Sequence, residues 1–271
     1  MSALALQRVM VRMLYDPAFA DRVFGAPHDA LADVALSPEE TRWITRTDRR
    51  AWRLDPMRRS RTLFALLEEY PASAADTVSA DGHTGHLDAF FSSSHFHDAI
   101  QTRQALVVAF GAFLLARAQP TLTPLARIEA AITRCRRATT GAHPDQGSVT
   151  LAPGCEVLEL PAGALDRYTA IVTALDQANR PALETVLAEG FRLSAPATRD
   201  ESGVEHVLVE PGAAGPRLGE IPEALARLLV AATQPLASDA LRQVALSLGA
   251  EGHEADELID ELVTDGVLLR G

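Results

Sequence analysis

The last 68 residues constrain the fold most, because their strand and helix signals allow few arrangements. Residues 204–209 (Val-Glu-His-Val-Leu-Val) are a β-branched run that ends at Pro211-Gly212, as a strand closed by a turn does. Apolar residues then recur at helical spacing in three segments, residues 220–231, 237–248 and 254–264. Residues 267–269 (Val-Leu-Leu) predict a closing strand. A strand, three helices and a strand in this order predict a winged-helix-like module.

The charge of residues 204–271 decides between two kinds of ligand for such a module. The segment holds 4 Arg against 12 Asp and Glu, a net charge of −8. A DNA-binding face must neutralise phosphates with Lys and Arg, so this segment would repel DNA. The same module can instead offer an open strand edge to a peptide, whose backbone hydrogen bonds supply affinity. We therefore expect a peptide-docking module and no nucleic-acid partner, with a winged-helix DNA-binding regulator as the alternative.

Charge also differs between the two halves of the chain. Residues 1–140 carry 17 Arg and 15 acids, whereas residues 141–271 carry 8 Arg and 21 acids. Residues 139–147 are rich in turn formers and mark the boundary. We expect an all-helical partner-binding domain over 1–140 and a winged-helix-like domain over 148–271, opened by a hairpin around Pro153-Gly154. The fold class is thus α+β and mostly helical.

Composition points to an ordinary globular protein of the cytoplasm. Hydrophobic residues make up 47% of the chain and charged residues 23%. Cys135 and Cys155 form no CxxC motif and no disulfide framework, which favours a reducing compartment. The N-terminus has no signal-peptide pattern. The most apolar stretch, residues 106–115, is too short to cross a bilayer, so no membrane partner is expected.

Arginines are concentrated in residues 42–61. The eight are Arg42, Arg46, Arg49, Arg50, Arg53, Arg58, Arg59 and Arg61, and both tryptophans, Trp43 and Trp52, lie among them. Arg58, Arg59 and Arg61 fall in the first turns of a predicted helix, where the helix dipole disfavours positive charge. Either acids of the same segment pair with them, or they dock a protein partner; nucleic acid is the third interpretation. The candidate partner-binding residues are Arg58, Arg59, Arg61 and Trp52.

Histidines and acids are concentrated in residues 81–98. The histidines are His83, His86, His95 and His97, beside Asp81, Asp88 and Asp98. Imidazole and carboxylate can bind iron or zinc, yet no HxxxH or HExxH pattern places two ligands on one helix face. Nucleophile-elbow, Walker and dinucleotide-binding motifs are absent from the sequence. We expect no metal, cofactor or catalytic residue in this chain; a stand-alone metal-dependent enzyme using His83 to His97 is the alternative.

Several short motifs follow one another in the first half of the chain. They are residues 14–19 (Leu-Tyr-Asp-Pro-Ala-Phe), 36–40 (Leu-Ser-Pro-Glu-Glu), 58–63 (Arg-Arg-Ser-Arg-Thr-Leu), 66–71 (Leu-Leu-Glu-Glu-Tyr-Pro), 90–93 (Phe-Phe-Ser-Ser) with 96–97 (Phe-His), and 110–114 (Phe-Gly-Ala-Phe-Leu). In order and spacing they resemble the partner proteins of multinuclear non-heme iron oxidative enzymes in ribosomal peptide natural-product pathways, of the methanobactin and thiaglutamate types. The resemblance covers residues 10–116 and, more loosely, the C-terminal module.

This resemblance implies a non-catalytic subunit of a heterodimer, with the iron in the partner enzyme. The helical domain would hold that enzyme. A winged-helix-like recognition element would bind the leader of the precursor peptide as a strand beside its third strand, packed on its third helix. Carried onto this chain, the receiving strand is 204–209 and the flanking helix 254–263. The candidate peptide-binding residues are Val204, His206, Val207, Leu208, Val209, Leu258, Ile259 and Leu262. Residues 161–203 are an insertion that leaves the identity of the edge strand open.

Overall fold

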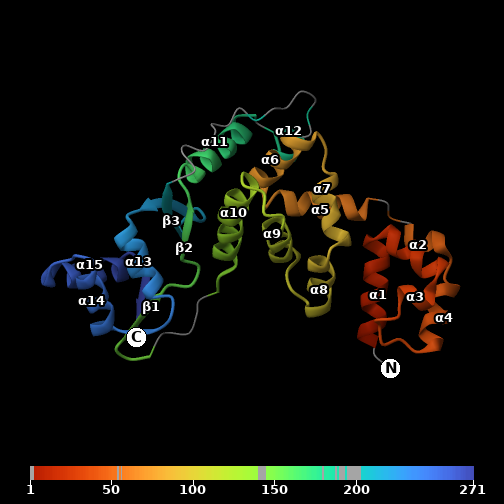
Figure 1. Ribbon diagram of the computed structural model, residues 1–271, viewed down its shortest axis with the longest axis horizontal. Coiled ribbons are helices and arrows are strands. Elements are labelled where there is room, and N and C mark those ends of the chain that lie inside the picture. Colours follow the sequence, from red (N-terminus) through yellow and green to blue (C-terminus); the bar gives the residue numbers. More distant parts are fainter. Residues whose placement is uncertain are drawn as a thin grey trace. The chain divides into compact units, whose positions relative to one another are not determined.

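The computed structural model describes residues 3–53, 55, 57–139, 145–178, 180–186, 188, 193 and 203–271. The described chain is mostly helical with two small antiparallel sheets, which agrees with the expected α+β class (Figure 1). It divides into two compact units, Met1–Gln119 with Arg180–Arg192, and Pro120–Asn179 with Leu193–Gly271. Within the described part, no helix combines the length and the apolar character needed to span a membrane.

The first unit is helical throughout its described residues. Its α-helices are α1 (Ala3–Tyr15), α2 (Pro17–Gly25), α3 (Pro27–Ala30), α4 (Pro38–Arg46), α5 (Arg58–Leu67), α6 (Pro71–Asp81), α7 (Gly85–Asp88), α8 (Ser94–Thr102), α9 (Leu106–Ala116) and α12 (Ala182–Val186), with short 3₁₀ turns at Arg49–Arg53 and Ala89–Ser92. Local sequence sets several of the starts. The Asp16 carboxylate accepts a hydrogen bond from the Phe19 N–H at 3.0 Å, and Ser37 and Glu40 form a capping box at α4.

Aromatic side chains dominate the core of the first unit. Phe90, Phe91, Phe96 and Phe110 are fully buried and stack edge to face or tilted on one another. A second group gathers the first two helices around Trp52. Tyr70 donates a hydrogen bond to the Val107 carbonyl at 3.1 Å and passes directly over Gly111 of α9.

The second unit combines helices with both sheets. Its elements are α10 (Leu122–Arg137), β1 (Ser148–Leu151), β2 (Glu156–Pro161), α11 (Ala164–Gln177), β3 (Val204–Glu210), β4 (Arg217–Ile221), α13 (Glu223–Ala231), β5 (Leu236–Ala237), α14 (Ser238–Ser247), α15 (Gly252–Thr264) and β6 (Leu268–Arg270). The strands are ordered β5-β1-β6 in one sheet and β2-β3-β4 in the other, and all neighbours are antiparallel.

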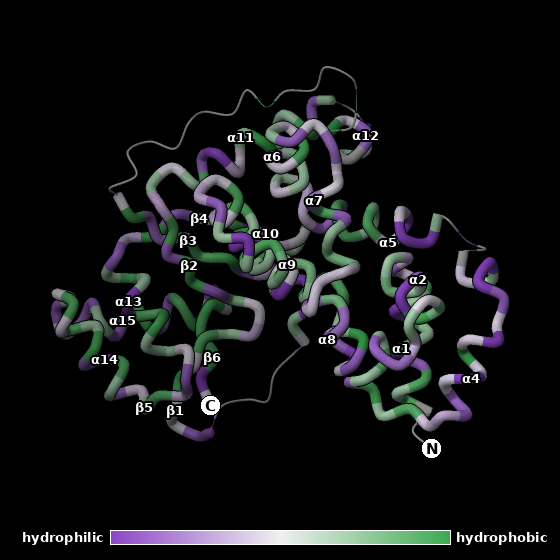
Figure 2. The backbone as a smooth tube through the Cα atoms, turned by 45° about the vertical axis from the view of Figure 1, so that its right-hand side comes forward, coloured by the Kyte–Doolittle hydropathy of each residue, from purple (hydrophilic) through white to green (hydrophobic). Residues whose placement is uncertain are grey.

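The helix α10 places the boundary between the units earlier than the expected residue 140. Ile128 and Ile132 of α10 pack against Val207 and Val209 of β3 and form a core with β2. Figure 2 shows these apolar segments in green beside one another. Because α10 buries its apolar side on this sheet, it belongs to the second unit, which begins at Pro120.

The expected hairpin around Pro153-Gly154 is wrong. The strands β1 and β2 flank that turn, but β1 pairs with β5 and β6, and β2 pairs with β3. Their side chains explain the separation: Val149 of β1 is buried with α13 to α15, whereas Leu158 of β2 is buried with α10. Because the two strands pack in different cores, they do not pair with each other as a hairpin.

Candidate peptide-binding surface

The strand expected to receive a peptide lies in the middle of its sheet. β3 pairs with β2 along one side, from Glu156↔Val209 to Pro161↔Val204. Along its other side it pairs with β4, from His206↔Ile221 to Glu210↔Arg217. With both sides occupied, β3 has no edge to offer, so the assignment of 204–209 as receiving strand is wrong. The error arises because residues 217–221 form β4, whereas the sequence pattern placed the start of a helix at residue 220.

Most of the predicted peptide-binding side chains are core residues. Val207 and Val209 are completely buried under α10. The other buried members, Leu208, Ile259 and Leu262, belong to the core of α13 to α15. Val204 is 58% exposed, and His206 and Leu258 are partly exposed. Of the predicted set, only these three can touch a ligand.

The β2-β3-β4 sheet has two edge strands, β4 and β2. Within the described residues, no strand pairs with the outer side of either. On the opposite edge, Arg127 of α10 donates to the outward Glu159 carbonyl of β2 at 2.5 Å. Backbone groups of antiparallel strands alternate between the two sides. With Glu159 facing outward and His206 opposite it, the alternation turns the N–H and C=O groups of Leu218 and Glu220 outward on β4.

An apolar groove begins where β4 ends. It has a volume of about 320 Å³ and is walled by apolar residues of α13, α14 and α15, which follow Pro222. The main contributors are Pro222, Leu225, Leu228, Ala245, Leu248 and Leu258. Leu258 is the one predicted peptide-binding residue in this wall. A groove of this size can hold one or two apolar side chains of an extended peptide.

An acidic hollow of about 570 Å³ lies over His206 at the same end of the sheet. Four glutamates line it: Glu159, Glu205, Glu220 and Glu223. The Glu205 carboxylate accepts hydrogen bonds from Gly163 and Leu165 at 2.8 and 2.7 Å, and Glu223 pairs with Arg227 at 2.6 Å. The carboxylates of Glu159 and Glu220 make no ion pair within the described part of the chain. The hollow therefore favours a cationic side chain.

Two of the predicted partner-binding residues have internal roles. Arg59 donates to both carboxylate oxygens of Asp88 at 2.6 Å and to the Tyr15 carbonyl at 2.8 Å. Trp52 is only 9% exposed and packs in the core of α1 and α2. Both side chains are engaged within the unit, so their assignment to a partner-binding surface stays a prediction.

The outer arginines of the same segment remain accessible. Arg58 and Arg61 both pair with Asp55, and the hydrogen bond from Arg61 is the main cause of a lowered pKa of that carboxyl. The Arg61 side chain is 63% exposed and Trp43 is 54% exposed. Of the four predicted partner-binding residues, Arg61 is therefore the most exposed.

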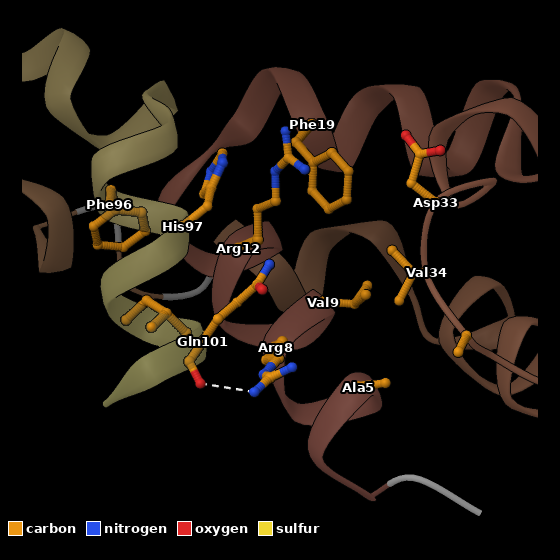
Figure 3. Close-up of a pocket in the computed structure, with 12 residues that line it drawn as sticks. Ala5, Arg8, Val9, Arg12, Phe19, Asp33, Val34, Phe96, His97 and Gln101 are labelled. Carbon is orange, nitrogen blue, oxygen red and sulfur yellow. Dashed lines mark hydrogen bonds between the residues drawn. The ribbon is translucent and has the colours of Figure 1, made fainter. Parts of the chain in front are cut away.

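The histidines of residues 83–97 are engaged in separate contacts. His86 pairs with Asp81, and the His83 imidazole accepts the Gly85 N–H at 3.1 Å. His97 lies in a pocket of the first unit (Figure 3). The structure therefore does not gather them into one ligand set.

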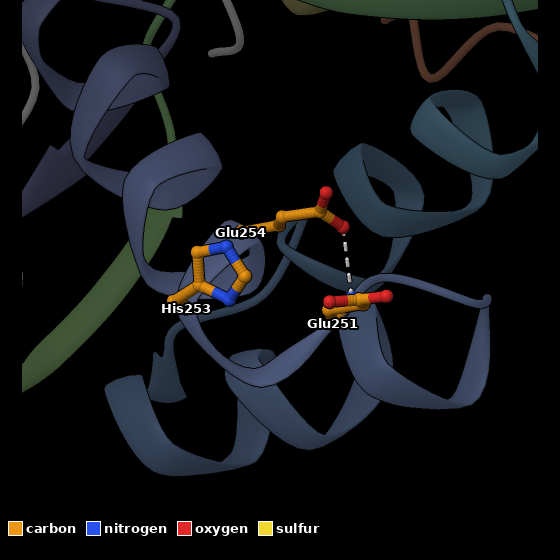
Figure 4. Close-up of side chains that lie close together, drawn as sticks. All are labelled: Glu251, His253 and Glu254. Atoms are coloured by element: carbon orange, nitrogen blue, oxygen red, sulfur yellow. Dashed lines mark hydrogen bonds between the residues drawn. The ribbon is translucent and has the colours of Figure 1, made fainter.

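Within the described residues, the group whose ligand atoms lie within 4.8 Å of one another is Glu251, His253 and Glu254 (Figure 4). Its two glutamates form the capping box of α15, in which the Glu251 N–H donates to the Glu254 carboxylate at 3.0 Å. All three residues are exposed. This arrangement is accounted for by helix capping.

The two cysteines are unsuited to nucleophilic chemistry. Burial raises the pKa of the Cys155 thiol to about 12, and nearby Glu210 adds to the effect. Burial likewise raises the pKa of Cys135, which belongs to α10 and packs in the core between that helix and the sheet. A nucleophilic cysteine needs the opposite shift, because the thiolate is the reactive form.

Comparison with known proteins finds no family and no curated relative: no protein-family model matches this chain, and no curated sequence does. The geometry of the surface therefore carries the functional argument. Sequence patterns missed β4 and most of the groove. The signal that could have found them is the short alternation Leu218-Gly219-Glu220-Ile221 directly before Pro222, which favours a strand stopped by proline.

Proposed function

We propose that this chain is a non-catalytic subunit that binds the leader segment of a ribosomally made precursor peptide. The peptide would pair with the open edge of β4 and be presented to a multinuclear iron oxidative enzyme bound by the helical unit. One observation carries the proposal: β4, whose outer side is unpaired in the described residues, ends directly before Pro222, which lines the apolar groove with Leu225 and Leu258. We therefore propose Leu218 and Glu220 of β4, in place of the residues of β3, as the residues that pair with the peptide. Leu258 is retained as a residue that contacts its side chains.

The order of elements supports a winged-helix-like recognition module. α13, the short strand β5, α14, α15 and β6 follow one another, and β1 lies between β5 and β6 in their sheet. In a winged helix the same order of helix, strand, two helices and strand is completed by one more strand. Here that strand comes from residues 148–151, far upstream in the chain.

Strand addition accounts for both parts of the surface. A peptide strand beside β4 would exchange backbone hydrogen bonds with Leu218 and Glu220, and its alternate side chains would point to opposite faces. One apolar side chain would fill the groove at Leu258. A basic side chain would approach Glu220 and Glu159 in the acidic hollow. We therefore expect a leader with apolar and basic residues, in which charge accelerates association more than it strengthens binding.

The charge of α15 favours a peptide over DNA. In a DNA-bound winged helix the last of the three helices enters the major groove, where phosphates surround it. Here that helix carries five acids and no arginine; the acids are Glu254, Asp256, Glu257, Asp260 and Glu261. Repulsion between these acids and the DNA phosphates opposes such a contact, most strongly at low salt.

We propose that the partner enzyme and this chain have different tasks. The iron would belong to the partner enzyme, and this chain would supply docking surfaces only. Arg61 and Trp43 are the exposed candidates for the enzyme contact on the helical unit. The raised thiol pKa values of Cys135 and Cys155 argue against either cysteine as a nucleophile.

The test is a fluorescence polarisation titration with fluorescein-labelled leader segments from the short reading frames beside this gene. Leu258→Asp places a charge in the apolar groove, so we expect its Kd to rise by about tenfold or more. Leu4→Asp makes the same change at an exposed position of α1, in the other unit, and should leave the Kd unchanged. If both variants bind the leader as the wild type does, the groove is not the peptide site.

A further inference from the structure

The first unit has a pocket of its own, far in sequence from the peptide surface. It has a volume of about 320 Å³ and lies between α1, the segment after α3 and α8 (Figure 3). One part of its wall is basic and comes from Arg8, Arg12 and His97. Another part is apolar and includes Val9, Val34 and Ile100. The volume suits a small organic molecule.

Two arginines that line this pocket hold unsatisfied buried donors. Arg8 and Arg12 are four residues apart on α1, so their side chains share one side of the helix. Arg8 donates through Nη2 to the Gln101 carbonyl at 2.7 Å, and Arg12 stacks over the Phe19 ring at 3.8 Å. The Nε–H of each is buried without an acceptor in the described structure. Buried donors without a partner are costly, so either arginine would gain by turning its Nε–H toward a ligand oxygen in the pocket.

His97 adds a hydrogen-bonding atom but no charge. Its imidazole bonds to the Phe91 backbone, and its Nε2 is buried without a partner in the described structure. Burial lowers the pKa of His97, and the nearby Arg12 lowers it further. The charges that line the pocket are those of Arg8 and Arg12 against the carboxylate of Asp33, and the Asp16 carboxylate also interacts with Arg12. These two acids offset much of the arginine charge, so the pocket suits a monoanion better than a phosphate dianion.

We propose that this pocket binds a small monocarboxylate with an apolar body. The carboxylate would lie between Arg8 and Arg12, which can hold it through parallel N–H donors. The apolar body would rest against Val9, Val34 and Ile100. The same chemistry is offered by a free carboxylic acid and by the C-terminus of a peptide with an apolar last residue. The proposal is independent of the peptide surface on β4, which belongs to the other unit.

Isothermal titration calorimetry on the full chain tests the site with named probes. Phenylacetate and hexanoate should bind, whereas phenylacetamide, which has no charge, and inorganic phosphate should not. Acetyl-Gly-Gly-Phe with a free C-terminus, compared with its amide, shows whether the pocket also accepts a peptide end. Arg8→Gln and Arg12→Gln should each weaken carboxylate binding by about tenfold or more. Arg22→Gln is the matched control, since Arg22 also faces the Phe19 ring, at 5.8 Å, but does not line the pocket.

Ala35→Trp gives a second variant that keeps both arginines. Ala35 is exposed at the rim of the pocket, so the indole should block entry without removing a charge, and binding should be lost. This variant decides the matter if circular dichroism shows that Arg8→Gln or Arg12→Gln fails to fold. The proposal is overturned if no carboxylate binds at about 10 mM. It is also overturned if phosphate binds as tightly, or if Ala35→Trp binds as the wild type does.

Discussion

Arg59 ties three helices of the first unit together through one guanidinium group. It lies in the first turn of α5, donates to both carboxylate oxygens of Asp88 at the end of α7, and donates to the Tyr15 carbonyl at the end of α1. The carboxylate offsets the cost of a positive charge at a helix start. We expect Arg59→Ala to lower the free energy of unfolding by about 1–2 kcal/mol, because bonds to charged groups are lost at a partly buried site.

Urea denaturation followed by circular dichroism measures this effect. Arg61→Ala is the control, since Arg61 pairs with Asp55 on the exposed side of the same helix and should change stability little. If the free energy of unfolding falls equally in the two variants, the ion pair of Arg59 with Asp88 does not stabilise the unit.

His97 should make the stability of the first unit sensitive to mild acid. Burial lowers its pKa in the folded chain below the ordinary value of about 6.5. As the pH falls through that ordinary value, the unfolded chain takes up a proton that the folded chain does not, so stability decreases. We expect the melting temperature to fall less in His97→Gln than in the wild type between about pH 7.5 and about pH 5.5. Parallel decreases in both proteins would rule out His97 as the source.

At the scale of elements, the crossing of Tyr70 over α9 depends on the absence of a side chain at Gly111. A Cβ atom there would overlap the Tyr70 hydroxyl group, which is fixed by its bond to Val107. We expect Gly111→Ala to cost about 1–3 kcal/mol of stability. The cost should shrink in a Tyr70→Phe background, where the hydroxyl is gone. Gly219→Ala is the control, because a Cβ at Gly219 meets nothing within 4 Å. A Gly111→Ala protein as stable as Gly219→Ala would contradict this packing.

Elements with strong local patterns could be predicted from the sequence. β3, α14 and α15 occur close to where the apolar periodicity placed them, and the Ser37 capping box marks the start of α4. Strand pairing could not be predicted, because it depends on residues far apart. The residues next to Val149 and Leu158 do not indicate that Val149 packs in the core of α13 to α15 and Leu158 in the core of α10. Because the sequence pattern predicts a helix from residue 220, it leaves β3 without a strand on that side.

The same limit applies to the candidate sites. Leu258 could be predicted, since its position on an amphipathic helix places it beside the core and at the surface of the module. Arg59 could not, because its partner Asp88 lies 29 residues away and charge density alone does not tell an internal partner from an external one. The basic pocket of Arg8 and Arg12 was missed entirely, since it combines side chains from separate helices.

At the scale of the whole molecule, the chain carries separate surfaces on separate units. The second unit has the free edge of β4, the apolar groove and the acidic hollow, whereas the first has the exposed Arg61 and Trp43 and the basic pocket. A subunit that must bind a peptide and an enzyme needs two surfaces of this kind. The different charge balance of the two halves of the sequence fits two partners of different charge.

The central claim, that an extended peptide pairs with β4, is tested most directly at Glu220. Its backbone N–H faces outward, so Glu220→Pro removes a donor from the free edge and leaves the bonds between β3 and β4 in place. Glu220→Ala removes the carboxylate alone and is the matched control. With both variants folded by circular dichroism, we predict that Glu220→Pro raises the Kd of the labelled leader by about tenfold or more relative to Glu220→Ala. Equal affinities of the two variants would contradict strand addition at β4.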